Sequence, residues 1–110
     1  MSTEHTDQTL FWSLAAEVLE LPGVTRSTMM GLPCLRLGST FFAACDRHTG
    51  NLLVKLSEER VDQLLRDGMA TPFAPAGRRF RQWTAIAPGD AEPWTTLIEE
   101  ALQYAAPASP

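Results

Sequence analysis

The spacing of apolar residues changes along the chain, and this change most constrains the fold. In residues 6–20, Leu10, Leu14 and Val18 recur every four residues, as is typical of an amphipathic helix. From residue 24 to residue 56 the period falls to two, which is typical of strands, and short turns rich in glycine and proline separate the segments. Because parallel strands need long crossover connections, links this short force neighbouring strands to run antiparallel. The sequence therefore predicts a helix followed by an antiparallel meander.

The strands of the meander are expected at residues 25–30, 34–37, 40–46 and 51–56. A second helix is expected to begin after the N-cap Ser57 and to stop near Gly68. After a loop at residues 71–77, a fifth strand is expected over residues 78–86, and a third helix starts at Pro93. The order α-β-β-β-β-α-β-α predicts an α+β fold. We expect one antiparallel sheet of about five strands with helices packed on one face, in a single domain spanning residues 1–110.

Composition places the chain among ordinary globular proteins. It has 110 residues, of which 45% are hydrophobic and 20% charged, enough for one modest core. No apolar run approaches the ~20 residues of a membrane-spanning helix. The polar residues 1–8 lack the basic segment of a signal peptide. We therefore expect a cytoplasmic protein that does not associate with membranes.

If the helices cover one face of the sheet, the other face is open to solvent. Strand alternation places Arg36, Lys55, Arg79, Arg81 and Trp83 on this open face, as a candidate interaction surface. Basic side chains neutralise phosphates and tryptophan stacks on unpaired bases, so the surface suits nucleic acid. Two alternatives remain: a solvated face, and a face that binds a protein partner or a second copy through charge complementarity with acidic helices. The net charge of −4 disfavours nucleic acid.

The other tryptophans have separate roles. Trp94 begins the apolar stripe of the third helix, so we expect it in the core. Trp12 falls off the apolar line of the first helix and is expected to be half exposed. It is therefore a candidate anchor for a partner, because tryptophan is enriched at interface hot spots; packing at the edge of the layer is the alternative.

The residue types that carry catalysis and metal binding are sparse. Cys34 and Cys45 lie on separate predicted strands, and His5 and His48 lie in a terminal segment and a turn, so no spacing predicts a metal site. We expect buried structural thiols; a redox or disulfide role is the alternative. No phosphate-binding glycine loop or nucleophile motif is present, so we expect a non-enzymatic protein without cofactors. A small-molecule binder or enzyme, with a pocket between helix and sheet, is the least favoured function.

Three segments together resemble the TfoX/Sxy N-terminal domain family: MMGLPCLRLGSTFFAACD (29–46), LLVKLSEERVDQLL (52–65) and TPFAPAGRRFRQWTAI (71–86). The order of elements is also similar to that of the related YjbR/MmcQ group, and the resemblance covers residues 18–104. It implies a bacterial regulatory protein without catalytic residues. TfoX proteins regulate natural competence, and YjbR-like proteins are often labelled DNA-binding. We therefore expect a regulatory or interaction module that binds a protein partner, with direct nucleic-acid binding through the basic sheet face as the alternative.

Overall fold

The computed structural model describes residues 9–29, 31–46, 48–89 and 91–106. Three helices and a six-stranded sheet form this part of the chain. The elements are α1 (Thr9–Val18), β1 (Val24–Met29), β2 (Leu32–Leu37), β3 (Thr40–Cys45), β4 (Leu52–Lys55), α2 (Glu58–Arg66), β5 (Thr71–Pro72), the 3₁₀ turn η1 (Pro75–Gly77), β6 (Trp83–Ile86) and α3 (Ala91–Ala105). The α+β class and the predicted order of the main elements are confirmed. No helix in the described part of the chain has the length and apolar character needed to cross a membrane.

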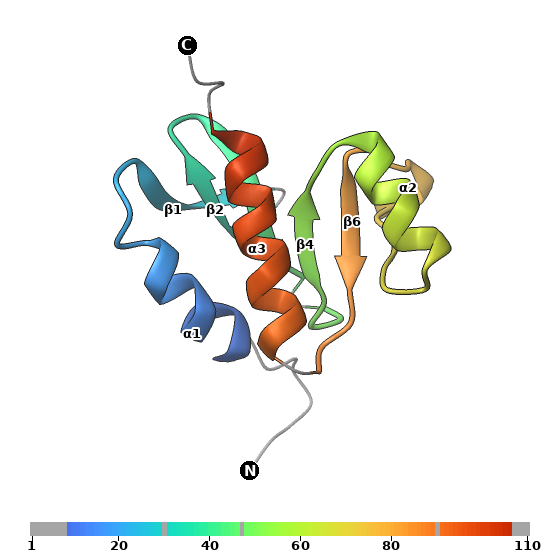
Figure 1. Ribbon diagram of the computed structural model, residues 1–110, viewed down its shortest axis with the longest axis horizontal. Coiled ribbons are helices and arrows are strands. Elements are labelled where there is room, and N and C mark those ends of the chain that lie inside the picture. Colours follow the sequence, from blue (N-terminus) through green and yellow to red (C-terminus); the bar gives the residue numbers. More distant parts are fainter. Residues whose placement is uncertain (1–8, 30, 47, 90, 107–110) are drawn as a thin grey trace.

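All strand pairs in the sheet are antiparallel, in the order β1-β2-β3-β4-β6-β5. The predicted meander corresponds to β1 through β4, and α1 and α3 lie side by side in front of the sheet (Figure 1). The sixth strand, β5, lies in a segment predicted to be a loop. It is held at the edge of the sheet because the Thr84 hydroxyl donates a hydrogen bond of 2.7 Å to the carbonyl oxygen of Thr71.

The bounds of the helices differ slightly from the predicted ones. Residues 6–8 of the predicted first helix lie outside the described residues, and α1 ends at Val18. The third helix begins at Ala91, so Pro93 lies in its first turn. Proline is tolerated there because the first backbone N–H groups of a helix have no partner within the helix.

The main core fills the space between the sheet and the helices. Phe11 and Ala15 of α1 are fully buried, and Trp94 of α3 is 2% exposed. The Trp94 indole Nε1 donates a hydrogen bond of 3.0 Å to the carbonyl oxygen of Ala87, so its polar group is satisfied. The predicted core position of Trp94 is confirmed.

Helix α2 is held at its start and through one charged side chain. The Ser57 hydroxyl accepts a hydrogen bond of 3.2 Å from the backbone N–H of Arg60, which confirms the predicted N-cap. The Arg60 guanidinium donates to both carboxylate oxygens of Glu100, at 2.6 and 3.2 Å. This two-bond ion pair ties α2 to α3, while Val61 and Leu64 insert into the main core.

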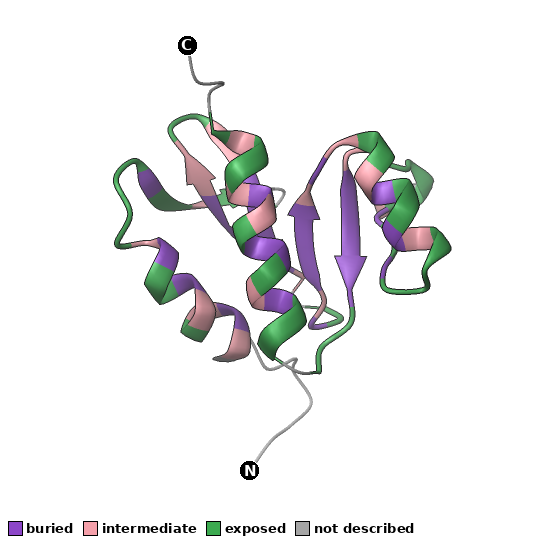
Figure 2. Ribbon diagram, in the orientation of Figure 1, coloured by how far each residue is buried: buried purple, intermediate pink, exposed green. Residues whose placement is uncertain are grey.

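The opposite face of the sheet is not open, and the prediction of a basic open face is wrong. A second apolar cluster lies on this face; its buried members are Leu32, Cys34, Ala44, Leu53, Phe73, Trp83 and Ala85. Trp83 is only 9% exposed, and all of β6 is buried (Figure 2). Phe73 and Phe80, whose stacked rings lie 5.8 Å apart, pack on this cluster from the segment between β5 and β6. These aromatic rings cover the face that no helix was expected to cover.

The predicted fifth strand over residues 78–86 is too long. Strand β6 begins only at Trp83, because the chain before it folds into a turn in which the Trp83 N–H donates to the Phe80 carbonyl at 3.2 Å. The Phe80 N–H in turn donates to the Phe73 carbonyl at 3.0 Å. Arg79 and Arg81 therefore do not share a strand face with Trp83, and their predicted alternation is wrong.

Trp83 lies in the second cluster, so its removal tests whether this face of the sheet is closed. We expect Trp83→Ala to lower the free energy of unfolding by about 3–5 kcal/mol, because it leaves a cavity under Phe73 and Phe80. Tyr104→Ala is the control, since Tyr104 is 43% exposed; its change should stay within about 0.5 kcal/mol. Urea denaturation measures both. Similar, small losses for the two variants would contradict a closed second face.

Candidate functional site

The basic residues predicted to form one surface are spread over different parts of the fold. Arg36 of β2 is half-buried, and its Nε donates to the Thr25 hydroxyl at 3.3 Å. Lys55 of β4 is half-buried and pairs with the buried Trp83 of β6. With Trp83 under the aromatic cover, these residues do not form a basic surface around an exposed ring.

Residues 78–82 form a separate basic site through their arginines. We call this segment the arginine turn. The Arg78 guanidinium lies 5.4 Å from the centre of the Phe80 ring, and an Arg79 nitrogen lies 3.6 Å from the carboxylate of Asp62. Arg81 is exposed and has no ion pair among the described residues. With Glu58, the turn lines a shallow hollow of about 350 Å³. Positive charge is thus concentrated on a turn whose backbone is fixed by hydrogen bonds.

Trp12 lies in α1, on the helical side of the sheet, and does not join the basic residues. It is half-buried, as the sequence predicts. The Arg26 guanidinium lies 4.2 Å from the centre of its ring, and the Phe11 ring meets it edge-on at 4.9 Å. Trp12 thus links α1 to β1 through a cation–π contact.

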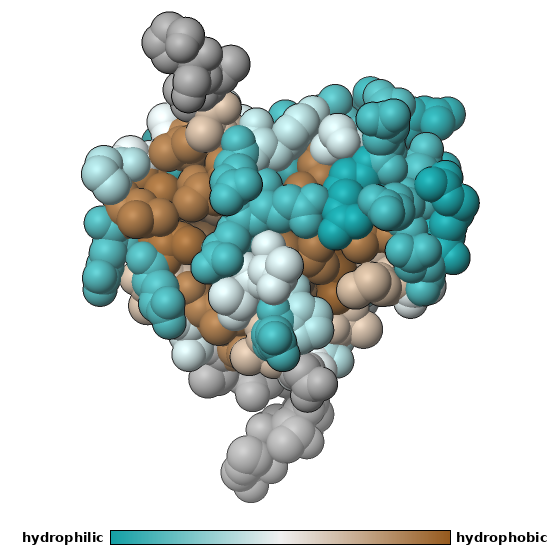
Figure 3. Space-filling view, in the orientation of Figure 1, coloured by the Kyte–Doolittle hydropathy of each residue, from teal (hydrophilic) through white to brown (hydrophobic). Residues whose placement is uncertain are grey.

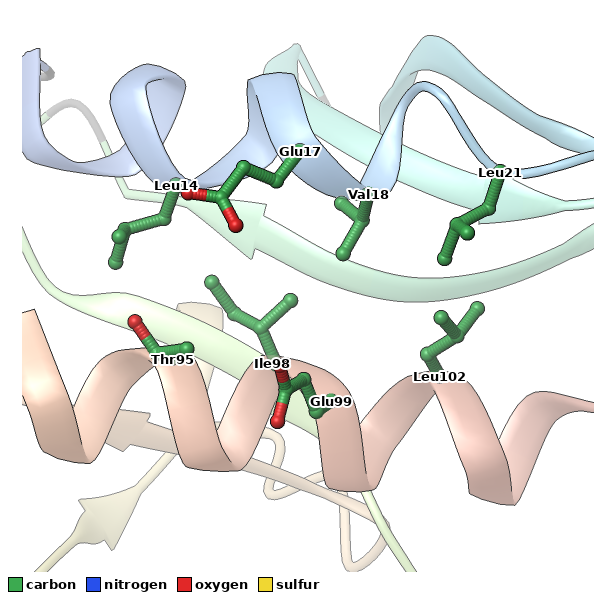
Figure 4. A pocket seen from close by; sticks show the side chains of 8 residues that line it. All are labelled: Leu14, Glu17, Val18, Leu21, Thr95, Ile98, Glu99 and Leu102. Atoms are coloured by element: carbon green, nitrogen blue, oxygen red, sulfur yellow. The ribbon is translucent and has the colours of Figure 1, made fainter.

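The sequence pattern does not indicate a hollow that lies on the helical side of the sheet, between α1 and α3. It has a volume of about 230 Å³, and we call it the α1–α3 groove (Figure 4). Its lining residues come from α1 and the turn after it, and from α3: Leu14, Glu17, Val18 and Leu21, and Thr95, Ile98, Glu99 and Leu102. The space-filling view shows apolar surface on this side of the molecule, beside hydrophilic side chains (Figure 3).

The groove exists because α1 and α3 bury their most apolar faces against the sheet and meet only along their flanks. Val18 and Ile98, which are 8% and 2% exposed, form its buried base. Leu14 and Leu102 are half-buried along its sides, and Leu21 is 45% exposed at one end. The result is a set of aliphatic side chains that the described residues do not cover completely.

Charge on the two helices that form the groove is of one sign. Glu17 and Glu99 are exposed and line it directly, one from each helix. Helix α3 also carries Glu92 and Glu100, and neither α1 nor α3 contains a lysine or arginine. The groove therefore combines an apolar base with acidic walls.

The thiols lie on opposite faces of the sheet. Cys34 belongs to the second cluster and Cys45 to the main core, so the two side chains cannot reach each other to form a disulfide. Burial raises the pKa of both thiols, and that of Cys45 reaches about 11, with a smaller contribution from the negative charge of Asp46. No group of three or more metal-ligating His, Cys, Asp or Glu side chains occurs among the described residues. His48 is exposed in the turn between β3 and β4.

Comparisons of the chain with protein-family models, with curated proteins and with solved structures find no match. The resemblance to the TfoX/Sxy N-terminal domain family stays a prediction that rests on the three segments quoted above.

Burial of the thiols predicts slow chemical modification. Since the thiolate is the reactive form, raising the pKa of Cys45 from 9.0 to about 11 lowers its thiolate fraction at pH 8 about 100-fold. We expect iodoacetamide to alkylate Cys45 in the native protein at least that much more slowly than in the urea-unfolded protein, with the native rate rising as the pH approaches 11. Cys34, whose pKa is also raised, should likewise react more slowly in the native protein. Mass spectrometry of peptides at timed intervals measures the rate at each cysteine. Equal rates in the native and unfolded protein would contradict the burial of Cys34 and Cys45.

Proposed function

We propose that this protein is a non-enzymatic interaction module that binds a protein partner through the α1–α3 groove. In this it would resemble a TfoX N-terminal domain in a bacterial regulatory setting. The observation that carries the proposal is a set of aliphatic side chains, Leu14, Leu21 and Leu102, left partly uncovered between two helices. Apolar surface that is contiguous and rimmed by polar residues is typical of an interaction site.

The size of the groove favours protein side chains over a small molecule. Its volume of about 230 Å³ lies below the roughly 300–1,000 Å³ of pockets that enclose drug-sized ligands. It lies between two helices (Figure 4), and its lining residues Glu17, Leu21 and Glu99 are exposed. A space of this shape fits a few aliphatic side chains presented by another chain.

The chemistry of the groove supports a binding role without catalysis. Nucleophilic catalysis needs a nucleophile with a base in hydrogen-bond reach, and none of the described residues that line the groove is a histidine, cysteine or lysine. The hydroxyl of Thr95, which is among these lining residues, donates a hydrogen bond of 3.0 Å to the carbonyl oxygen of Ala91. That bond holds the hydroxyl against its own helix, away from the role of a nucleophile.

The arginine turn favours a second candidate function, direct binding of nucleic acid. Arg78, Arg79 and Arg81 lie close together on a turn with a fixed backbone, which suits contacts with phosphates. The burial of Trp83 removes the aromatic ring that would have stacked on a base. This candidate therefore rests on phosphate contacts alone, and we rank it second.

Site-specific crosslinking tests the protein partner. We expect a photoreactive amino acid at Leu21, in the groove, to give a discrete crosslinked product in an extract of the cell that encodes the chain. The same group at Met69 should give none; Met69 is 51% exposed and lies outside the groove. Thr95→Trp, which fills the groove, should remove the Leu21 product. Crosslinking that is equal at both positions, absent at both, or unaffected by Thr95→Trp would refute the proposal.

The second candidate predicts binding that depends on salt. If phosphates contact the arginine turn, the protein is retained on a single-stranded DNA matrix at ~50 mM salt, and affinity falls steeply as salt rises. Changing Arg78, Arg79 and Arg81 together to glutamine should abolish retention, whereas the control Arg36→Gln should leave most of it. Absence of retention at ~50 mM salt, or equal retention by the triple variant, rules this candidate out.

A further inference from the structure

We infer that the occupant of the α1–α3 groove is an amphipathic helix of a different protein, with aliphatic side chains on one face and lysine or arginine beside them. This inference rests on the proposed function and specifies the partner. It follows from three properties of the groove: the spacing of its lining residues, the sign of its charge and its length.

The lining residues have the same spacing on both sides. Residues 14, 17, 18 and 21 line one wall and residues 95, 98, 99 and 102 line the other, so each wall follows the offsets 0, 3, 4 and 7. On α3 these offsets describe one face of a helix over two turns, a length of about 10 Å. On the other wall they describe one face of α1 up to Val18, and Leu21 continues the wall from the turn after the helix. A third helix laid along the groove would present its own side chains at the same spacing, as in helix-in-groove recognition.

The stick view shows where such side chains would go. Leu14 and Val18 point from α1 toward α3, and Ile98 and Leu102 point from α3 toward α1 (Figure 4). Aliphatic groups of the partner helix would contact these side chains and cover the parts of Leu14, Leu21 and Leu102 that are still exposed to water, since Val18 and Ile98 are already buried. Burial of the partner's own aliphatic side chains in this contact is the main source of affinity.

Charge selects the partner. Glu17 and Glu99 stand on opposite walls, and no lysine or arginine in α1 or α3 neutralises them. Lysine or arginine on both flanks of the partner's apolar stripe would meet these carboxylates, whereas acidic flanks would be repelled. Such rim charges act mainly on specificity and on the rate of association.

The same charges disfavour a second copy of this chain as the occupant. All charged side chains of α1 and α3 are acidic, so either helix would bring like charge to the groove of another copy. Helix α2 carries both signs, but its apolar residues Val61 and Leu64 are buried and Arg60 is held by Glu100. The helices of the chain therefore do not supply the complementary face.

Synthetic helical peptides of about 18 residues are the probes. One peptide has leucines at helical spacing flanked by lysines; a second replaces the lysines with glutamates, and a third replaces the leucines with serines. We expect the Leu/Lys peptide to bind the full chain, the Leu/Glu peptide to bind at least about tenfold more weakly, and the Leu/Ser peptide not to bind. Fluorescence anisotropy at two salt concentrations measures the affinities, and salt should weaken only the Leu/Lys complex.

Charge reversal in the protein provides the matched control. Glu17→Lys with Glu99→Lys should reverse the preference between the Leu/Lys and Leu/Glu peptides. Glu59→Lys with Glu92→Lys changes the net charge equally at exposed positions outside the groove and should leave the preference unchanged. Thermal melting confirms that each variant folds, which is expected because all four side chains are exposed. Equal binding of the two peptides, or reversal by the control pair, overturns the inference.

The outcomes separate this inference from the proposed function. One outcome is that Thr95→Trp removes the crosslink at Leu21 but the protein shows no preference for the Leu/Lys peptide. This outcome would support the proposed function and refute the inference. A crosslinked product with twice the mass of the chain, together with sedimentation as a dimer, would also refute it and identify a second copy as the occupant. Absence of both the crosslink and peptide binding would refute both.

Discussion

The centre of the sheet is apolar on both faces, and the rest of the structure depends on covering both. In β3 and β4, Cys45 and Val54 belong to the main core, while Ala44 and Leu53 belong to the second cluster. Because the burial of apolar surface is the dominant favourable term in folding, neither face can be left in water. Helices α1 and α3, together with Val61 and Leu64 of α2, cover one face, and the aromatic residues between β5 and β6 cover the other.

These two covers determine where polar and apolar groups remain exposed. On the second face, Phe73, Phe80 and Trp83 pack together. The arginines next to them in sequence lie at the surface, in the arginine turn. On the helical face, two helices pack along their flanks and leave the α1–α3 groove between them. The covered sheet face thus offers positive charge beside the half-buried ring of Phe80, whereas the groove offers an apolar base of aliphatic side chains and acidic walls. This difference is why we place protein binding on the helical side.

The order of elements could be predicted because it depends on local periodicity. The fourfold spacing of Leu10, Leu14 and Val18, the two-residue period after residue 24, and the cap at Ser57 are properties of neighbouring residues. The burial of Trp94 and the half-exposure of Trp12 followed from their positions on helices. These features need no knowledge of how distant segments pack.

The candidate site could not be predicted because it depends on packing between distant segments. Alternation sorts Leu53 and Lys55 onto one face of β4, but it does not say whether that face is covered. Phe73 lies in a segment predicted to be a loop and Phe80 in the predicted fifth strand, so their role as a cover was not evident. The groove brings together Leu14 and Leu102 from opposite ends of the chain, and only the tertiary arrangement of α1 and α3 creates it.

The central claim is that the helical side binds the partner. The most direct test is to follow the methyl NMR signals of the protein during titration with the Leu/Lys peptide. The claim predicts that the largest shifts occur at the methyl groups of Leu14, Val18, Ile98 and Leu102. It also predicts that the methyl groups of Leu32 and Leu53, under the aromatic cover, stay unchanged. Shifts confined to Leu32 and Leu53, or spread evenly over both faces, would contradict it.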